Sequence, residues 1–193
     1  MNILVTGGEG FIGKKLVNKL EKEGHNVISL DKTESADIVA DLSSENFFFD
    51  AIDWDIDYIF HLAAQSGGYY SLKDPYIDGK WNCLGTINVV KLAQKLKVKK
   101  LIYTSSMAIY GNQKSSSENL LGKNQPKAIS FYGVSKFTGE LYTKLIYEHS
   151  GIPYTIFRLF ATYGSGQDLE NEHQGILSIY LNQALNDKKS ATI

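Results

Sequence analysis

The chain has 193 residues, 43% of them hydrophobic, and its 20 Lys and Arg against 21 Asp and Glu give a net charge of −1. This length is enough for one domain with a real hydrophobic core, and the balanced charge gives no electrostatic basis for binding nucleic acid or a membrane surface. No apolar run approaches the length of a membrane span, Met1 leads directly into an apolar strand, and the single cysteine, Cys83, cannot form an internal disulfide, so we expect a cytoplasmic protein without a signal peptide.

The first predicted strand, 3–5, leads into a glycine-rich turn. Gly7, Gly10 and Gly13 stand three residues apart, and apolar positions at helical spacing follow until Gly24. Such a turn lets the backbone approach a pyrophosphate, and the helix N-terminus offers free N–H groups and a favourable dipole. The spacing G-x-x-G-x-x-G differs from the G-x-G-x-x-G of ordinary two-domain dehydrogenases. A tight turn with a purely structural role is the alternative.

The second predicted strand, 27–30, ends in Asp31, about twenty residues beyond the glycines. A carboxylate at this position accepts hydrogen bonds from both hydroxyls of an adenosine ribose and repels a 2′-phosphate. It therefore favours NAD over NADP, although the neighbouring Lys32 leaves NADP open. The alternative is a solvated acid that opens the turn 31–33. Because Asp31 follows the glycines at the expected distance, we prefer the cofactor role.

Strands and helices alternate through the rest of the chain. We expect strands at 38–40, 58–62, 100–105 and 154–158, and helices at 81–96, 135–149 and 175–186. This order predicts an α/β fold, a Rossmann-like doubly wound parallel sheet with helices on both faces. Ligands of such sheets bind at the carboxyl ends of the strands, where this chain gathers small and polar residues: Gly7, Asp31, Asp41, Ala63, Ala64, Gln65, Ser105, Ser106, Phe160 and Ala161. The polar stretch 111–130 is expected to be a long loop.

Tyr132 and Lys136 stand four residues apart, on one face of a helix. Tyrosine is a poor base at neutral pH, because its reference pKa is near 10, but a neighbouring ammonium and a positively charged nicotinamide ring stabilise the phenolate. Ser106, at the end of an upstream strand, can hydrogen-bond the oxygen whose C–H bond is broken. The alternative is an exposed helical pair with a minor effect on stability.

Further motifs follow in order along the chain: Thr6–Gly13, Asp31, Asp41-Leu42, His61–Gln65, Asn82–Thr86, Tyr103–Ser106, Tyr110-Gly111, Glu118, Pro126, Tyr132–Lys136, Arg158–Gly164, Gln167-Asp168 and Gly175–Ile179. With these residues the chain resembles the extended short-chain dehydrogenases/reductases. More narrowly, it resembles the NAD-dependent nucleotide-sugar epimerase/dehydratase family typified by UDP-galactose 4-epimerase. The resemblance is collinear over essentially the whole chain.

The resemblance implies that Ser106, Tyr132 and Lys136 form a catalytic triad. Tyr132 would take a proton from a sugar hydroxyl while a hydride passes to the cofactor and later returns to the other face of the sugar. The implied NAD-binding residues are Gly7, Gly10, Phe11, Ile12, Gly13, Asp31, Lys32, Asp41, Leu42, Leu62, Ala63, Ala64, Gln65, Thr104, Tyr132, Lys136 and Phe160. The implied contacts to a nucleotide-diphosphate sugar are Ser66, Ser106, Met107, Tyr132 and Ala161. No metal site is expected.

The sequence departs from the family pattern in three places. Met107 and Ala108 stand where related 4,6-dehydratases carry an Asp-Glu pair, so epimerisation or simple oxidation–reduction is favoured over dehydration. Ala161 replaces a common asparagine and supplies no side-chain hydrogen bond to a substrate. Because the family's chains are longer, we expect 1–193 to be the NAD-binding domain with the catalytic residues, and the substrate domain to be missing after Ile193. A non-catalytic NAD-binding module or fragment, an NAD(P)-dependent carbonyl reductase and a nucleotide-sugar dehydratase are the alternatives.

The resemblance also implies a homodimer, since helices 81–96 and 135–149 correspond to the pair that this family packs into an intersubunit four-helix bundle. The default is that their apolar residues face the chain's own sheet: Leu84, Ile87, Leu141 and Leu145. His61, at a strand end, is expected to be a packed, hydrogen-bonded histidine and not a catalyst. Asn82 either belongs to the family's helix motif or is an ordinary polar residue at a helix end.

Overall fold

The computed structural model describes residues 1–47, 52, 54–112, 125–171 and 175–186. It divides into two compact units, Met1–Arg158 and Leu159–Ile193, and each is described by itself. Most of the predicted loop 111–130, including Glu118, lies outside the described residues, as does the end of the chain from residue 187.

A six-stranded sheet in the order β3-β2-β1-β4-β5-β6 forms the centre of the first unit. Its strands are β1 (Asn2–Thr6), β2 (Asn26–Asp31), β3 (Ile38–Val39), β4 (Tyr58–His61), β5 (Lys100–Ser106) and β6 (Tyr154–Leu159). The pairs from β3 through β5 are parallel. This order is that of dinucleotide-binding α/β proteins, in which ligands lie beyond the carboxyl ends of the strands. The predicted Rossmann-like fold is therefore confirmed.

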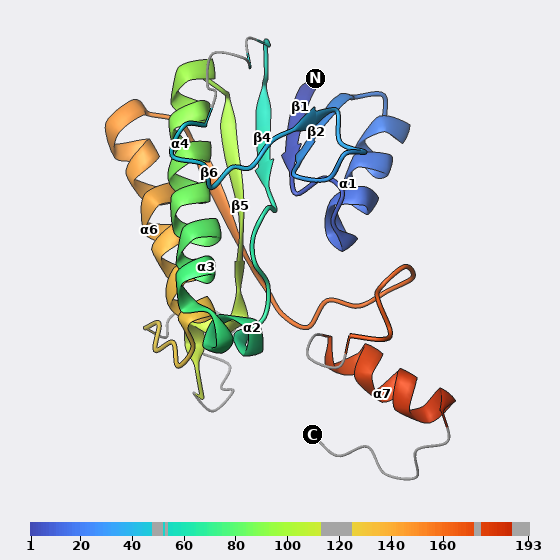
Figure 1. Ribbon diagram of the computed structural model, residues 1–193. Coiled ribbons are helices and arrows are strands. Elements are labelled where there is room, and N and C mark those ends of the chain that lie inside the picture. Colours follow the sequence, from blue (N-terminus) through green and yellow to red (C-terminus); the bar gives the residue numbers. More distant parts are fainter. Residues whose placement is uncertain (48–51, 53, 113–124, 172–174, 187–193) are drawn as a thin grey trace. The chain divides into compact units, whose positions relative to one another are not determined.

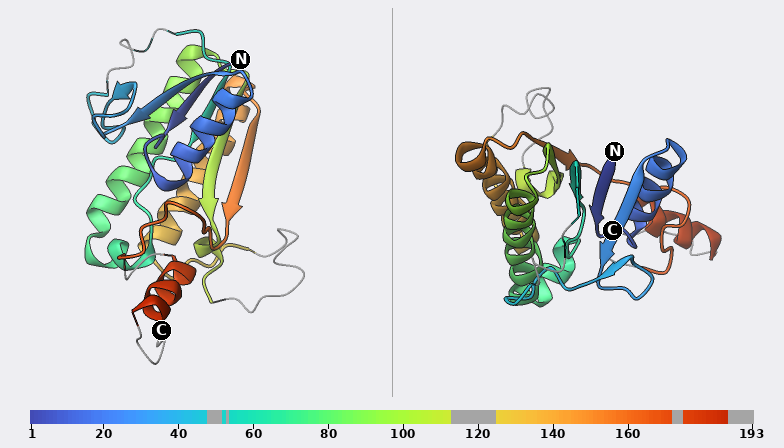
Figure 2. Two further views of the ribbon diagram at one scale, coloured as in Figure 1. Left: turned by 90° about the vertical axis from the view of Figure 1, so that its right-hand side faces the viewer. Right: turned by 90° about the horizontal axis from the view of Figure 1, so that it is seen from above.

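Helices cover both faces of the sheet (Figure 1). Helix α1 (Phe11–Lys22) packs on β1 and β2, whereas α4 (Gly85–Leu96) and α6 (Phe131–Ser150) pack side by side on the opposite face, behind the sheet when α1 is in front (Figure 2). Two short helices, α2 (Gly68–Lys73) and α3 (Pro75–Gly79), and a π-helical turn, Lys80–Leu84, lead into α4. A 3-10 turn, Met107–Tyr110, follows β5, and α7 (Ile176–Leu185) belongs to the second unit.

The core of the first unit lies between the sheet and the helices α4 and α6. Leu4, Ile59 and Leu101 on adjacent strands are fully buried in it, together with Leu92 of α4 and Ile146 of α6. Each such side chain contributes about 1.5–3 kcal/mol to folding. Among the described residues, no helix combines the length and the apolar character that crossing a membrane requires.

Several element boundaries differ from those expected. Helix α6 begins at Phe131, four residues before the predicted start, because the Ser130 side chain accepts a hydrogen bond from Gly133 N at 3.1 Å and caps the helix. Helix α3 was not predicted, although Asp74 caps it through Ile77 N and Pro75 opens it. Tyr132 therefore lies in the first turn of α6, one turn before Lys136.

An ion pair between the buried Glu140 and the partly exposed Arg158 joins α6 to β6. The Glu140 side chain is fully buried and accepts hydrogen bonds from Arg158 Nε and Nη2, each at 2.8 Å. Arg158 Nη1 also donates to Tyr110 Oη at 2.8 Å. Burial raises the pKa of Glu140, but the hydrogen bonds and charge of Arg158 outweigh it and leave the pKa below its usual value. Removing one residue of such a pair leaves the charge of the other uncompensated, which destabilises the folded protein.

Replacing Arg158 by methionine is expected to lower the free energy of unfolding by about 3 kcal/mol, because the Glu140 carboxylate then stays buried without its partner. Urea unfolding followed by circular dichroism measures the loss. The control is Lys144→Met, since the exposed Lys144 Nζ lies 4.0 Å from Glu140 and should contribute less than about 1 kcal/mol. Equal losses in the two variants would contradict the prediction.

Candidate active site

The glycine turn between β1 and α1 brings backbone atoms closer than side chains allow. Gly7 has a φ of +70°, and a Cβ there would lie 2.6 Å from Ala63 N. A Cβ on Gly13 would overlap the carbonyl oxygen of Gly7. Gly10 precedes α1 without a side-chain cap, so the first N–H groups of the helix stay available to a ligand. The turn is thus an anion cradle that side chains would fill, which fits a cofactor pyrophosphate.

Asp31 lies beside this turn at the carboxyl end of β2. Its Oδ2 accepts a hydrogen bond from Glu9 N at 3.2 Å, and its Oδ1 accepts from Thr33 N and Oγ1 at 3.3 and 3.1 Å. A carboxylate has about four acceptor positions, so about one position remains for a ribose hydroxyl beside these three hydrogen bonds. Lys32 stacks its ammonium 3.8 Å from the centre of the Trp81 ring. Lys32 therefore already has a partner within the protein.

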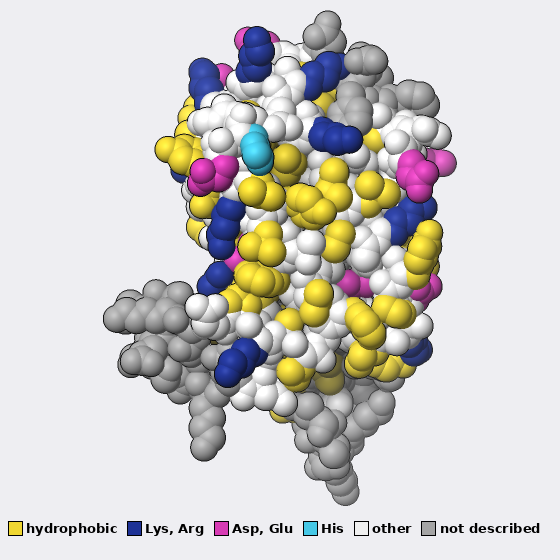
Figure 3. Space-filling model, turned by 90° about the vertical axis from the view of Figure 1, so that its left-hand side faces the viewer, with side chains coloured by type: hydrophobic (Ala, Val, Ile, Leu, Met, Phe, Trp, Pro, Cys, Tyr) yellow, Lys and Arg dark blue, Asp and Glu magenta, His cyan; other side chains and the backbone are white. Residues whose placement is uncertain are grey.

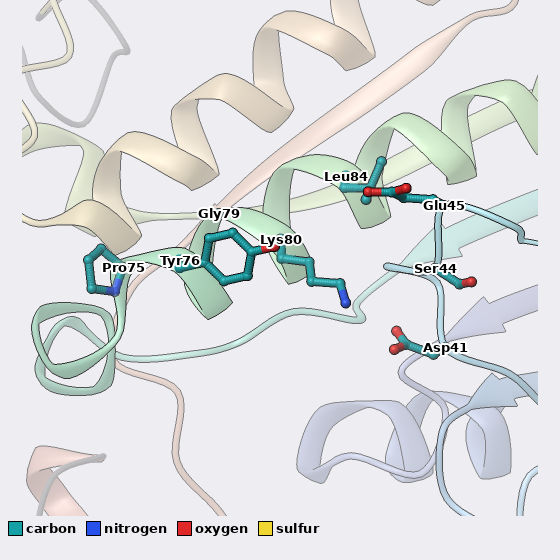
Figure 4. Close-up of a pocket in the computed structure, with 8 residues that line it drawn as sticks. All are labelled: Asp41, Ser44, Glu45, Pro75, Tyr76, Gly79, Lys80 and Leu84. Atoms are coloured by element: carbon teal, nitrogen blue, oxygen red, sulfur yellow. The ribbon is translucent and has the colours of Figure 1, made fainter.

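Asp41 borders a cavity of about 680 Å³ near the same edge of the sheet (Figure 4). The cavity is lined by Asp41, Ser44, Glu45, Pro75, Tyr76, Gly79, Lys80 and Leu84. Burial raises the pKa of Asp41, but hydrogen bonds from Ser43 and the charges of Lys80 and Lys32 outweigh it and lower the pKa. The neighbouring Leu42 is buried, and its carbonyl oxygen accepts from Asn88 Nδ2 at 2.7 Å. The predicted roles of Asp41 and Leu42 beside the adenine stay predictions.

Ser106, Tyr132 and Lys136 come together from β5 and α6. The Tyr132 hydroxyl is hydrogen-bonded to Ser106, whose Oγ also accepts from Ala108 N at 3.1 Å. Lys136 is only 3% exposed, and its Nζ lies 4.5 Å from the centre of the Tyr103 ring. An exposed helical pair is therefore the wrong interpretation of Tyr132 and Lys136.

Burial sets the protonation of this cluster. It raises the pKa of Tyr132, with a further rise from the charge of Asp78, while the hydrogen bond with Ser106 acts in the opposite direction. Burial also lowers the pKa of Lys136 to about 7, against the opposing effects of Asp78, Glu140 and Cys83. Near neutral pH the Lys136 ammonium and its neutral amine are close in free energy, so neighbouring charges decide which form is present.

A chain of buried hydrogen bonds links the strands to the helix that precedes α4. His61 Nδ1 lies 2.7 Å from Thr6 Oγ1 and its Nε2 3.1 Å from Thr86 Oγ1, which donates to Asn82 O. Burial, and then the charge of Lys136, lower the pKa of His61 to about 3, so the ring is neutral. The expectation of a packed, hydrogen-bonded His61 is confirmed.

Asn82 is not a polar residue at a helix end, because it is buried inside the helical run between α3 and α4. Its Oδ1 accepts from Gln65 N at 2.7 Å, and its Nδ2 lies 3.1 Å from Gln65 O, 3.1 Å from Asp78 Oδ1 and 2.9 Å from Ser135 Oγ. It thus fixes the segment after β4 against α6. Asp78 was missed by sequence reasoning, since nothing in the pattern distinguishes it from an exposed helical acid.

The other predicted site residues of the first unit follow the same strand ends. Leu62, Ala63, Ala64, Gln65 and the exposed Ser66 come directly after β4. Thr104 Oγ1 donates to His61 O at 3.0 Å, and Met107 is 46% exposed beside Ser106. Phe160 and Ala161 are exposed residues of the second unit, and their roles stay predictions.

The model of the NAD-dependent epimerase/dehydratase family matches residues 3–193. The chain belongs to this family. The family's NAD dependence agrees with the cofactor predicted from the glycine turn and Asp31.

Individual relatives and solved structures agree with the family. A putative UDP-glucose 4-epimerase of Methanocaldococcus jannaschii is 34% identical over 96% of this chain and 64% of its own length. The UDP-glucose 4-epimerase of Thermotoga maritima, solved with UDP-glucose, has a TM-score of 0.86 at 32% identity over 96% of this chain and 63% of that one. The Thermus thermophilus UDP-glucose 4-epimerase, in complex with NAD, has a TM-score of 0.82 at 27% identity, with coverages of 97% and 63%. A UDP-glucuronic acid decarboxylase of Arabidopsis thaliana also matches, at 28% identity over 96% of this chain and 44% of its own. The chain thus spans less than two thirds of each of these proteins.

Replacing Gly13 by alanine is expected to weaken NAD binding at least tenfold, because the added Cβ overlaps the Gly7 carbonyl and must deform the cradle. Titration calorimetry with NAD measures the change. Gly68→Ala is the control, since its Cβ would make only an ordinary contact of 3.7 Å with the Ser130 side chain. An unchanged NAD affinity in a folded Gly13→Ala variant would refute the assignment of the turn.

Proposed function

We propose that residues 1–193 form the NAD-binding, catalytic part of a UDP-sugar 4-epimerase, with Ser106, Tyr132 and Lys136 as its catalytic residues. The observation that carries the proposal is that the half-buried Tyr132 interacts with Ser106, one helical turn before the buried Lys136, at the carboxyl edge of the sheet that also carries the glycine turn and Asp31. Family membership and epimerase relatives support it.

The cluster supports removal of a proton from a sugar hydroxyl. Tyr132 Oη takes that proton as the O–H bond breaks, and Ser106 Oγ holds the same sugar oxygen while its bond to carbon becomes a carbonyl. The Lys136 ammonium stabilises the Tyr132 phenolate, which burial alone would disfavour. Bound NAD supplies the acceptor for the hydride from the sugar carbon and the donor that returns it. Return of the proton from Tyr132 to the sugar oxygen then restores the protein.

The residues after Ser106 favour epimerisation over dehydration. Met107 and Ala108 carry no carboxyl group to remove or supply the proton of an eliminated water molecule. The NAD-binding residues that we propose in the first unit are those predicted above, from Gly7 to Lys136. The cytoplasmic location stays a prediction.

We further propose a homodimer built on α4 and α6. The default expectation that Leu141 and Leu145 face the sheet is wrong, because they are 46% and 47% exposed, in line with the 53% exposed Val134. These positions form one stripe along α6, and apolar side chains gather on this face of the molecule (Figure 3). Leu84 and Ile87 are partly buried. The stripe supports packing of α6 against a second copy.

Two measurements test the catalytic proposal on the native gene product. Calorimetry compares NAD with NADP, and NMR follows UDP-glucose and UDP-galactose at catalytic enzyme concentration. Interconversion without accumulation of NADH is expected. NAD binding without turnover would indicate a binding module, stoichiometric consumption of NAD(P)H a reductase, and carbon dioxide release from UDP-glucuronic acid a decarboxylase.

Tyr132→Phe is expected to lower kcat by roughly 10²–10⁴-fold, since the variant loses the group that accepts the proton. Its NAD dissociation constant should change less than about threefold, because the ring and the glycine turn remain. Tyr147→Phe removes the same atom from an exposed tyrosine of the same helix and should leave kcat unchanged. Comparable activity in the two variants would exclude Tyr132 as the base.

Leu145→Glu is expected to shift the protein from dimer to monomer in analytical ultracentrifugation, since a charge in the α6 stripe opposes apolar packing. Leu72→Glu is the control, because Leu72 is 63% exposed on α2, outside the stripe. A dimer that persists in the Leu145→Glu variant would place the interface elsewhere.

A further inference from the structure

Asp78 is a buried carboxyl group outside the proposed catalytic triad. It lies in α3, is 1% exposed, and its Oδ1 accepts a hydrogen bond from Asn82 Nδ2 at 3.1 Å. Its Oδ2 is buried without a hydrogen-bond partner among the described residues. Burying a carboxylate in this way is costly unless a charge offsets it. The position of Asp78 therefore needs an explanation beyond helix stability.

The charge that we consider is the Lys136 ammonium, on α6, the helix that packs against α3. Asn82 Nδ2 bridges Asp78 Oδ1 and the Oγ of Ser135, the residue next to Lys136 in α6. The Lys136 side chain is itself buried and packs over the Tyr103 ring. Burial raises the pKa of Asp78, while a hydrogen bond with Ser135 and the charge of Lys136 act in the opposite direction and favour the carboxylate.

Glu140, the other carboxylate that acts on Lys136, already has cations of its own as partners. Arg158 binds both of its oxygens, and Lys144 lies 4.0 Å from one of them. Asp78 makes no ion pair within the described ranges, so its charge is not offset at close range by another cation. A negative charge that is not neutralised locally acts over a longer distance in a buried site.

We propose that Asp78 is a positioning residue of the reaction: its buried carboxylate is the counter-charge that keeps the Lys136 ammonium protonated behind Tyr132. This role rests on the proposed function, in which Lys136 must be charged to stabilise the Tyr132 phenolate. Asp78 touches neither substrate nor cofactor in this role.

The proposal fixes the direction of two pKa changes. The negative charge of Asp78 raises the pKa of Lys136 against the effect of burial, and it raises that of Tyr132 as well. Removing the charge therefore lowers both pKa values. The titratable or charged groups that act on Lys136 or lie against it are Asp78 of α3, Cys83 of the π-helical turn, Glu140 of α6, Tyr103 of β5 and His61 of β4, and Tyr132 lies one turn before it on α6.

The test measures the pKa of Lys136 by NMR in protein labelled with ¹³C at lysine Cε, with Lys136→Met used to assign the signal. In the wild type the signal should titrate at about 7. In Asp78→Asn, which keeps an oxygen for Asn82, it should titrate lower by on the order of one pH unit. Where the native gene product turns over a UDP-sugar, both limbs of its kcat/KM profile should move to lower pH.

Asp74→Asn is the matched control, because it removes one negative charge from the exposed cap of the same helix and asparagine still caps it. A second measurement uses the wild type alone: the ¹³Cγ signal of Asp78 should show a step at the pH where Lys136 titrates. An unchanged Lys136 pKa in folded Asp78→Asn, equal shifts in both variants, or no such step overturns the proposal. Coupling of Asp78 to Lys136 in a protein that binds no NAD would instead refute the proposed function alone.

Discussion

Helix α6 buries two opposite charges one turn apart, and much of the first unit is arranged around that constraint. Lys136 and Glu140 both lie on the face of α6 that packs against β5. Glu140 is balanced by Arg158, which comes from β6 and also donates to Tyr110. Within the part of the chain that the structure describes, Lys136 makes no ion pair, and its ammonium lies over the Tyr103 ring, with Asp78 and Glu140 acting on it from a greater distance. The Glu140–Arg158 ion pair holds α6 against β6, whereas the protonation of Lys136 depends on the charges around it.

The buried hydrogen bonds of His61 and Asn82 have a structural role near the proposed site. Thr6 of β1 and Thr86 of α4 hold the two nitrogens of His61, and burial keeps the pKa of the ring low, so it stays neutral. Gly7, the first residue of the glycine turn, directly follows Thr6, and Asn82 fixes Gln65 beyond β4. One buried network therefore sets the positions of the cradle, of the segment after β4 and of the first turn of α6.

The sequence was sufficient to predict the features that depend on local pattern. Gly13 and Asp31 belong to a strand–turn–helix–strand motif with a fixed spacing, and the alternation of elements determined the sheet. The facing of Leu141 and Leu145 was not predictable, because α6 has apolar residues on more than one side and periodicity does not say which side meets the sheet. Ser130 and Asp74 are of residue types that favour helix N-caps, and both cap helices in the structure.

The burial of Asp78 and Asn82 was not predictable for a different reason. Their burial follows from the π-helical turn Lys80–Leu84, which changes the phase between α3 and α4 and which no hydrophobic period encodes. Proteins rarely bury Asp and Lys without a direct ion pair, yet Asp78 and Lys136 are both buried without one among the described residues. Departures of this kind from local rules concentrate where a protein trades stability for chemistry. The buried charges around Lys136 therefore support the proposed reactive centre more strongly than the Tyr132–Lys136 spacing alone.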